Sequence, residues 1–413
     1  MMGTVPRTER VEEVVIVGGG IAGLATALAL NRVGKSCLIL ERWHELRESG
    51  AALSLLPNAW RALHALGIAH KLIPNYRIVQ SGRVTNLETG SVQTRSFPDS
   101  SDGEENGARI VHRKALLEAL AEEIPQEAIR FSSKLASIRT EAGPDSSSIT
   151  VLQLEDGEIM KAKVVIGCDG LYSVVAQWLG LAQPRDSGRS AVRGLAVFPE
   201  GHGLKREAQQ FLFANRRAGL IPLNDHDAYW FISHPTTPKV KELGRHPEHI
   251  QREVLLNLAV DLPLEFKQMI EHSVPSSLTW DPLMFRTPWD IVLGRAHRGC
   301  VTVAGDAFHP TTPDLAQGGC IALEDAVVLA RCLAHAESPK EVEESLGRYV
   351  AERRWRAAAV VAASYFSGWV QQASAGVWTR PLRLVRDFLF YRFIFTWIAR
   401  LTLFDCGTLP KVG

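Results

Sequence analysis

The stretch that most constrains this chain is residues 14–41, which read VVIVGGGIAGLATALALNRVGKSCLILE. Its short apolar runs predict a buried strand over Val14–Val17 and another over Cys37–Leu40. Between them, Leu24–Leu30 is a helix-forming run, and Gly34 lies where such a helix should end. A strand, a helix and a second strand in this order make one complete βαβ unit, which indicates an α/β fold.

Three glycines in this unit have the spacing of a dinucleotide-binding motif. Gly18, Gly20 and Gly23 stand in the pattern GxGxxG between the first strand and the helix. The first glycine permits the tight turn, the second lets the backbone approach a pyrophosphate, and the third lets helix and strand pack closely. Glu41 follows about twenty residues later, where a carboxylate can accept hydrogen bonds from a ribose. The motif therefore predicts dinucleotide binding at a helix N-terminus, and by itself it does not separate FAD from NAD.

The composition is that of an ordinary globular protein. With 413 residues the chain exceeds a usual single domain, so we expect two packed domains. Hydrophobic residues make up 46% and charged residues 22%, and the net charge of +1 gives no electrostatic reason to expect a nucleic-acid partner. The six cysteines form no CxxC pair and no cluster at metal-ligand spacing, so we expect no metal site. Residues 1–13 lack the apolar core of a signal peptide, and we expect a cytoplasmic protein.

A second stretch favours FAD over NAD. Cys300–Ala304 predicts a buried strand that runs into Gly305 and Asp306. The Asp306 carboxylate can accept hydrogen bonds from a flexible polyol, and FAD has such a ribityl chain whereas NAD does not. Further on, Gln317-Gly318-Gly319 offers bare backbone N–H groups at the start of a helix. Such a helix start favours the negative charge that develops on a reduced flavin.

Three other positions are candidates for contact with the cofactor. Val164–Gly167 predicts a buried strand that ends at the turn Asp169-Gly170. Arg113 lies in the first turn of an expected helix, where a cation opposes the helix dipole, so this side chain is a candidate to face an anion or a carbonyl. Arg47 lies in a polar loop, and the sequence leaves open whether it is a surface arginine or lies along the nucleotide.

With these motifs in order along the whole chain, the sequence resembles the class A, single-component FAD-dependent aromatic hydroxylases. This group includes p-hydroxybenzoate, salicylate and urate hydroxylases and zeaxanthin epoxidase. The likeness is greatest to the plant monooxygenase-like branch, in the phrases VTVAGDAFHPTTPDLAQGGCIALEDA and FDCG. The three ordered signatures are specific for the family, and they say little about the substrate.

The resemblance implies a reaction. FAD is reduced by NADPH or NADH and reacts with O₂ to give a C4a-hydroperoxide, which hydroxylates or epoxidises a small aromatic or apolar substrate. Two alternatives stay open at this point. One is a flavin-dependent reductase or oxidase on the same fold, and the other is a non-catalytic FAD-bound effector.

The resemblance also implies where FAD binds. Glu41 contacts the adenosine ribose, Asp306 the ribityl–pyrophosphate region, and the residues from Pro313 to Gly319 line the isoalloxazine. His309 belongs to the fold of the motif rather than acting as a catalytic base. The residues predicted to contact the cofactor are Gly18, Gly20, Ile21, Ala22, Gly23, Glu41, Arg42, Arg47, Arg113, Leu135, Asp169, Gly170, Asp306, Pro313, Gln317, Gly318 and Gly319.

The sequence departs from the family pattern at one position and leaves the catalytic residues unassigned. The family segment DGxxSxxR has Ala176 in place of its arginine, which puts the identity and the binding of the reductant in doubt. No substrate-activating base can be ranked from the sequence. The candidates in the middle of the chain are Arg193, Arg217, His226 and Tyr229.

The expected architecture is a Rossmann-like GxGxxG FAD-binding domain, an inserted mixed β-sheet substrate domain and C-terminal helices. The sequence predicts two amphipathic helices near 248–260 and 264–272 and a long helix from about Pro339 to Gln372. We expect the FAD-binding domain to comprise 1–75, 105–188 and 290–340, the substrate domain 76–104 and 189–289, and the helical region 341–413. The segment 382–404 is strongly apolar, but its charged residues argue against a membrane span. It predicts helices packed on the body, and the alternative is a peripheral helix in a bilayer surface.

Overall fold

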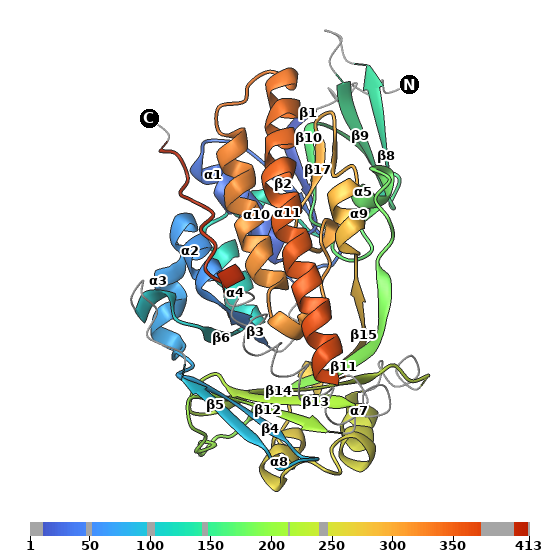
Figure 1. Cartoon of the computed structure of the whole chain (residues 1–413). Helices are drawn as coiled ribbons and strands as arrows, with labels where there is room; N and C mark the ends of the chain where they lie inside the picture. Colours follow the sequence, from blue (N-terminus) through green and yellow to red (C-terminus); the bar gives the residue numbers. More distant parts are fainter. Residues whose placement is uncertain are drawn as a thin grey trace, which may run out of the picture.

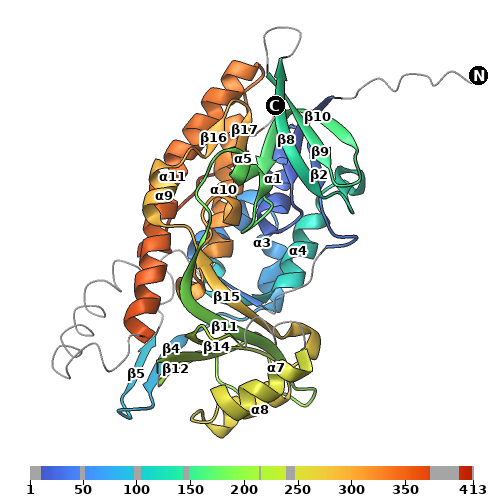
Figure 2. The same ribbon diagram turned by 90° about the vertical axis from the view of Figure 1, so that its right-hand side faces the viewer.

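The structure is a computed structural model that places two large β-sheets one above the other, with helices packed on both (Figure 1). The long helix α11 runs along the molecule from the upper sheet to the lower one, as both views show (Figure 2). The residues that the structure describes are 11–46, 52–96, 104–142, 148–213, 215–238, 247–372 and 400–411.

The upper sheet contains the predicted βαβ unit. Its strands run in the order β16-β17-β10-β1-β2-β7, and β9 pairs with β10 on one side and with β8 on the other. The strand β1 pairs in parallel with β2 and β10, and β10 pairs in parallel with β17, so these four strands end at one edge of the sheet. The bounds are β1 (Val11–Val17), β2 (Leu38–Leu40), β7 (Ile129–Arg130), β8 (Leu135–Ala142), β9 (Ser148–Leu154), β10 (Ile159–Gly167), β16 (His297–Arg298) and β17 (Val301–Val303).

Helices cover this sheet, and the main ones begin and end close to where the sequence predicts. The first, α1, is buried along most of its length because its apolar run faces the sheet on one side and α10 on the other. The final long helix spans Pro339–Gln372, the range expected from the sequence. The bounds are α1 (Ile21–Arg32), α2 (Pro57–Leu66), α3 (Ala69–Leu72), α4 (Arg113–Ala121), α5 (Val174–Trp178), α9 (Pro288–Leu293), α10 (Gly318–Leu333) and α11 (Pro339–Gln372).

The lower sheet is assembled from two separate parts of the chain. Its order is β15-β11-β14-β13-β12-β4-β5, and the early hairpin β4–β5 joins it through a parallel pairing of β4 with β12. This membership supports the predicted division into domains, which stays a prediction. The bounds are β4 (Ser81–Asn86), β5 (Val92–Ser96), β11 (Arg185–Val197), β12 (Glu207–Phe213), β13 (Arg216–Pro222), β14 (Asp227–Pro235) and β15 (Thr279–Phe285).

The two faces of the lower sheet have different surroundings because side chains alternate along each strand. On one face, Trp230 and Ile232 of β14 are buried against helices, and Trp230 meets Phe266 of α8 edge to face. The other face carries Tyr229 and Phe231. Figure 2 shows that α7 and α8 lie below the sheet, so this other face looks toward the upper part of the molecule. The covering elements are α7 (Pro247–Glu253), the π-helical η4 (Val254–Leu258), where a continuous helix over 248–260 was expected, and α8 (Leu264–Glu271).

Short elements connect these layers. A separate two-stranded sheet pairs β3 with β6, which lies directly before α4. The remaining bounds are β3 (Ala52–Leu55), β6 (Arg109–His112), η1 (Ile73–Asn75), η2 (Glu104–Asn106), η3 (Gln126–Ala128), η5 (Pro275–Ser277), η6 (Gly305–Ala307) and η7 (Pro313–Leu315).

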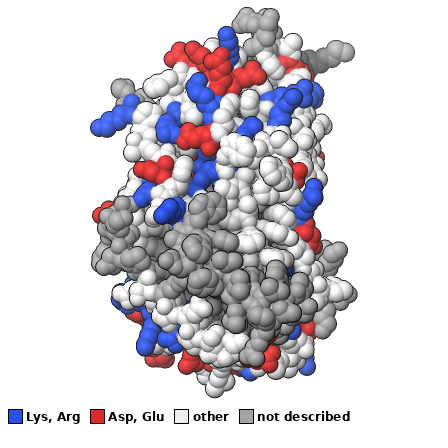
Figure 3. All heavy atoms as spheres, viewed as in Figure 1, with Lys and Arg blue, Asp and Glu red and all other residues white. Residues whose placement is uncertain are grey.

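The surface in Figure 3 shows intermixed positive and negative side chains over the upper part of that face. Of the apolar C-terminal segment 382–404, residues 382–399 lie outside the described residues, so the expectation of packed helices or of a peripheral membrane contact stays a prediction. Among the helices that the structure describes, none combines the length and the apolar character needed to cross a bilayer.

Candidate functional site

The predicted motifs converge because each one follows a parallel strand of the upper sheet. Gly18 follows β1, Asp169 follows β10 and Gly305 follows β17, so all three lie at the carboxyl edge of the same sheet. The backbone connects the first two turns directly, since the N–H of Cys168 donates to the Val17 carbonyl at 2.7 Å. In open α/β sheets this edge is where ligands bind.

The three glycines of the first motif have three different surroundings. Gly18 has φ +104°, and a Cβ there would lie 2.5 Å from the Cys168 oxygen. A Cβ on Gly23 would overlap the carbonyl oxygen of Gly18, so helix and turn touch backbone to backbone. A Cβ on Gly20, in contrast, would meet no protein atom within 4 Å. The open side of Gly20 supports its prediction as the point where a pyrophosphate approaches.

Glu41, which is predicted to contact the adenosine ribose, also fixes this turn. Its carboxylate is buried and accepts hydrogen bonds from the N–H of Gly19 at 2.6 Å and of Trp43 at 3.0 Å. Each carboxylate oxygen keeps a lone pair beyond these bonds, so a ribose hydroxyl can still donate to it. Close by, Arg42 is exposed and lies over the Trp43 ring, and Leu135 is buried at the start of β8. Arg47 lies outside the described residues.

The Asp169-Gly170 turn is held by the start of α5. The Asp169 carboxylate accepts a hydrogen bond from the Ser173 hydroxyl at 2.5 Å and from the N–H of Val174 at 2.7 Å. Ser173 in turn caps the helix, because its Oγ accepts from the N–H of Ala176 at 2.8 Å. Ala176, which stands where the family has arginine, is buried in the core.

Replacing Ser173 by alanine is expected to lower the free energy of unfolding by about 1 kcal/mol, because the helix cap is lost. Urea unfolding of the two proteins measures this difference. Ser137→Ala, which changes an exposed serine on β8, is the control and should leave the midpoint unchanged. An unchanged midpoint for Ser173→Ala would show that the cap contributes nothing.

The second motif packs directly on the first. Gly305 has φ +60°, and a Cβ there would lie 2.7 Å from the Cβ of Ala22 in α1. Asp306 follows with an exposed side chain, and Arg113 is near enough for the two charges to interact. An acceptor that follows β17 and the guanidinium at the start of α4 thus lie near each other.

The loop from Pro313 to Gly319 ends at the N-terminus of α10. Ala316 adopts the left-handed conformation with φ +54°, which turns the chain into the helix. The Gln317 side chain is buried, and its Oε1 accepts a hydrogen bond from Asn58 at 2.9 Å, so this side chain supports the loop. The first N–H groups of a helix have no partner within it. Gly318 and Gly319 therefore present backbone donors and no side chain at this point.

A buried ionic network, which the sequence does not predict, packs against the second motif. Asp325 of α10 accepts hydrogen bonds from the Gly305 N–H at 2.8 Å, His309 Nε2 at 2.6 Å and Arg353 Nε at 2.7 Å. Arg353 also lies 2.7 Å from Glu324, and all four charged or titratable side chains are fully buried. The contact of His309 with Asp325 supports its predicted place in the fold of the motif.

Three of the four candidate bases share one face of the lower sheet, and the fourth lies apart from them. Arg193, Arg217 and Tyr229 lie on the face of the lower sheet that looks toward the motifs, by strand register. Arg217 is bound to Asp314 and lies over the Phe231 ring. His226 is exposed, and its Nδ1 lies 3.1 Å from the Phe198 carbonyl oxygen. The assignment of a base stays open.

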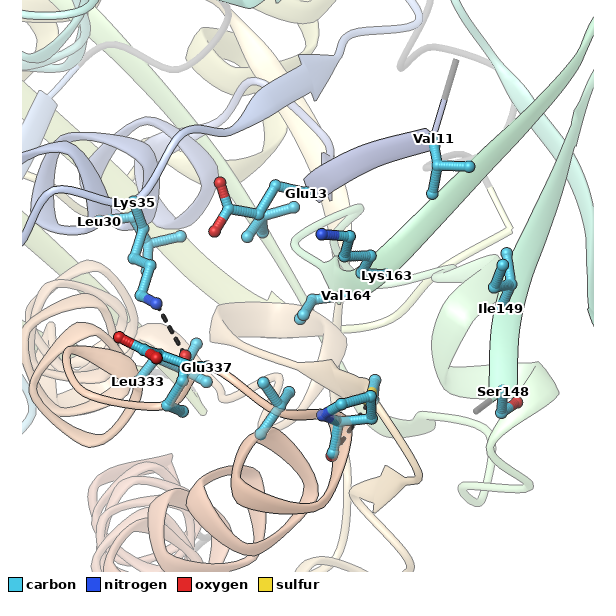
Figure 4. Close-up of a pocket in the computed structure, with 15 residues that line it drawn as sticks. Val11, Glu13, Leu30, Lys35, Ser148, Ile149, Lys163, Val164, Leu333 and Glu337 are labelled. Carbon is cyan, nitrogen blue, oxygen red and sulfur yellow. Dashed lines mark hydrogen bonds between the residues drawn. The ribbon is translucent and has the colours of Figure 1, made fainter. Parts of the chain in front are cut away.

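A cavity of about 440 Å³ lies elsewhere, at the amino ends of β1 and β10 (Figure 4). Val14 and Val164 line it, and Lys35 at its rim donates a hydrogen bond to the Ala336 carbonyl. Since β1 runs from this cavity toward Gly18, the cavity and the glycine motif are at opposite ends of the strand. It is therefore separate from the candidate site. Within the described residues, no group of three His, Cys, Asp or Glu side chains is arranged to hold a metal ion.

Comparisons with known proteins identify the family and the fold. A family model described as an FAD binding domain matches residues 12–364. The curated relative Monooxygenase 2 of Arabidopsis thaliana is 39% identical over 96% of this chain and 98% of its own length. Aurachin C monooxygenase/isomerase of Stigmatella aurantiaca is 34% identical over 87% of this chain and 89% of its own length. The solved structure of Klebsiella pneumoniae HpxO with FAD and uric acid has the same fold, with a TM-score of 0.80 at 23% identity over 97% of this chain and 98% of that one.

Proposed function

Because this chain belongs to the FAD-binding-domain family of flavin-dependent monooxygenases, we propose that it uses NADPH or NADH and O₂ to insert one oxygen atom into a small aromatic or apolar substrate. One observation carries the proposal. The open side of Gly20, the Asp306 carboxylate and the N-terminus of α10 belong to one edge of the upper sheet, although they come from opposite ends of the matched family region. A single extended ligand with a pyrophosphate, a polyol and an electron-poor ring suits these three features in that order.

Each part of the site would hold a different part of FAD. The amide groups after Gly18 and the open side of Gly20 would take the pyrophosphate, and Glu41 the adenosine ribose. Asp306 would accept hydrogen bonds from the ribityl hydroxyls, with Arg113 beside it. The N–H groups at the start of α10 would face the pyrimidine oxygen of the isoalloxazine, where they favour the reduced, anionic ring. When bound, FAD supplies hydride acceptance and the activation of O₂.

The substrate would lie between that ring and the lower sheet. Tyr229 and Phe231 lie on the face of the lower sheet that looks toward the loop from Pro313 to Gly319. Aromatic side chains bind planar rings well. A solved relative of this fold contains uric acid together with FAD, and uric acid is a small planar molecule of this kind. The protein would contribute positioning and the exclusion of water, which protects reactive oxygen chemistry from side reactions.

The test is reduction and reoxidation of the purified, FAD-loaded protein. NADPH or NADH is mixed with it anaerobically, and loss of the oxidised flavin absorbance is followed; oxygen is then added with and without candidate planar aromatic compounds. Reduction, followed by oxygen consumption that a compound stimulates without an equal yield of hydrogen peroxide, is the expected result. Reduction with stoichiometric peroxide for every compound favours an oxidase. Tight FAD without reduction by either nucleotide favours the effector, with Ala176 as its sequence correlate.

Gly20→Ala is expected to weaken FAD binding roughly tenfold or more while the apoprotein unfolds at an unchanged temperature. The added methyl group meets no protein atom, and φ −80° suits alanine, so only a ligand would be displaced. Fluorescence titration measures the affinity and circular dichroism the unfolding. Gly347→Ala, on α11 and with its nearest neighbour at 3.5 Å, is the control and should bind FAD normally. If Gly20→Ala binds FAD as tightly as the wild type, the pyrophosphate does not bind at this position.

A further inference from the structure

Asp314, in the loop that precedes α10, is bound by two arginines of the lower sheet. Arg189 of β11 makes a bidentate pair with it, with Nη1 to Oδ1 at 2.9 Å and Nη2 to Oδ2 at 2.8 Å. Arg217 of β13 lies 3.4 Å from Oδ1. The side chain of Asp314 is 2% exposed, that of Arg189 10% and that of Arg217 6%. A carboxylate so enclosed is a structural partner for these cations and is not free to act as a base.

The helix α11 closes this ionic cluster from a third side. Gly368 lies against it, and a Cβ there would overlap both Arg189 Nη1 and Asp314 Oδ2. One turn further on, Gln371 accepts a hydrogen bond from Arg217 Nη1 at 2.8 Å. Two strands of the lower sheet, the loop and α11 therefore meet at Asp314, and the absence of a side chain at Gly368 makes the close approach feasible.

The same loop is attached to these neighbours at further points. The Ser364 hydroxyl of α11 donates to the Thr312 carbonyl at 2.5 Å. Arg286, which follows β15 of the lower sheet, donates its backbone N–H to the Pro310 carbonyl at 3.1 Å and its Nη1 to the Ala307 carbonyl at 2.8 Å. These bonds hold the loop by its backbone, and the ion pair at Asp314 adds an anchor through a side chain close to the start of α10.

We propose that Asp314 is a positioning residue, which with Arg189 as its main partner fixes the start of α10 to the lower sheet. The inference rests on the proposed function, since the N–H groups being fixed are those of Gly318 and Gly319. On this proposal, the N–H groups that would face the flavin are aligned by the lower sheet, which would bind the substrate. The upper sheet, which carries the glycine motif, does not align them. Because Arg217 also lies 5.2 Å over the Phe231 ring, a ligand bound against that ring would lie next to the same cluster.

The test compares Arg189→Lys and Asp314→Asn with matched controls. Lysine keeps the charge of Arg189 but cannot make a bidentate pair. The controls are Arg185→Lys on the same strand and Asp281→Asn, which lies 3.8 Å from another arginine of β11 and is 60% exposed. Amide hydrogen exchange of residues 312–320 is measured in the apoprotein. FAD affinity and the midpoint potential of the bound flavin are measured in the loaded protein.

Both cluster variants should accelerate exchange in this loop about tenfold and weaken FAD binding about tenfold, because a charge-assisted pair is lost. They should also shift the midpoint potential to a more negative value, because misaligned amides favour the reduced ring less; a general loss of stability would not do this. In both cluster variants, exchange over residues 14–30 should stay as in the wild type. In both control variants, all three measurements should stay as in the wild type. Should Arg189→Lys fail to fold, Gly368→Ala, which separates the same pair, takes its place.

The proposal is overturned if both cluster variants leave the exchange rates of the loop and the midpoint potential of the flavin unchanged. If the wild-type protein binds no FAD, the proposed function fails, whereas the exchange measurement in the apoprotein still decides whether Asp314 anchors the loop. If FAD binds and the exchange rates rise while the potential stays fixed, Asp314 stabilises the loop without aligning the amides, and the proposed role is wrong.

Discussion

Gly23→Ala is expected to abolish FAD binding and to destabilise the apoprotein by about 3 kcal/mol or more, the upper part of the range for overpacking a core. The new methyl group would overlap the carbonyl oxygen of Gly18, a backbone atom that cannot rotate away. The start of α1 would have to move off β1, and the N–H groups that it presents would move with it. Thermal unfolding of the apoprotein and the flavin content after purification measure the two effects.

The comparison with Gly20→Ala makes this prediction specific. Both variants add one methyl group within the same motif, but only the one at Gly23 meets protein. Loss of stability with Gly23→Ala and none with Gly20→Ala would separate the packing role of the third glycine from the ligand-facing role of the second. Equal unfolding temperatures for Gly23→Ala and the wild type would contradict the backbone contact.

The second large effect is expected from Arg353→Met, which should lower the free energy of unfolding by about 3–5 kcal/mol. Arg353 is fully buried between Glu324 and Asp325, so its removal leaves two buried carboxylates with less compensation. Urea unfolding at pH 7 measures the loss. Arg331→Met is the matched control, because Arg331 links the same two helices through Glu352 but is 37% exposed, and a surface pair contributes at most about 1 kcal/mol.

The pH dependence should carry the same signature. Burial alone would raise the pKa of Asp325, but His309 and Arg353 outweigh it and hold the pKa below its ordinary value. A carboxyl with a lowered pKa in the folded state stabilises the protein above its unfolded pKa, and this contribution is lost as the pH falls below roughly 4. The loss of unfolding free energy caused by Arg353→Met should therefore be smaller at acid pH than at pH 7. A deficit independent of pH would point to lost packing instead of unpaired charge.

Local patterns account for the elements that the sequence predicts well. The apolar run and the glycine spacing over residues 14–41 specify a strand, a turn and a helix, because each depends on neighbours within a few positions. The long helix Pro339–Gln372 is predicted for the same reason. The convergence of Gly18, Asp169 and Gly305 also follows, since parallel strands of one sheet end at the same edge.

What the sequence does not predict depends on partners far away in the chain. Glu324 and Asp325 appear in a largely apolar helix, and nothing near them identifies Arg353, 28 positions on from Asp325, as their partner. Arg189 lies in an ordinary strand run, 125 positions before Asp314. Pairs of this kind are set by the packing of whole elements, which periodicity along one element does not encode.

The assembly of the lower sheet has a consequence for how this chain leaves the ribosome. The hairpin β4–β5 is made early, but Ser81 pairs with a strand that begins at Glu207, 126 positions later. Until then one edge of β4 has no native partner, and an open strand edge is a template for pairing between chains. The upper sheet also depends on strands made later, since β1 pairs with β10 and β10 pairs with β17. We expect neither sheet to close on a nascent N-terminal fragment, so that folding is completed late and the yield of active protein depends on chaperones that shield that edge.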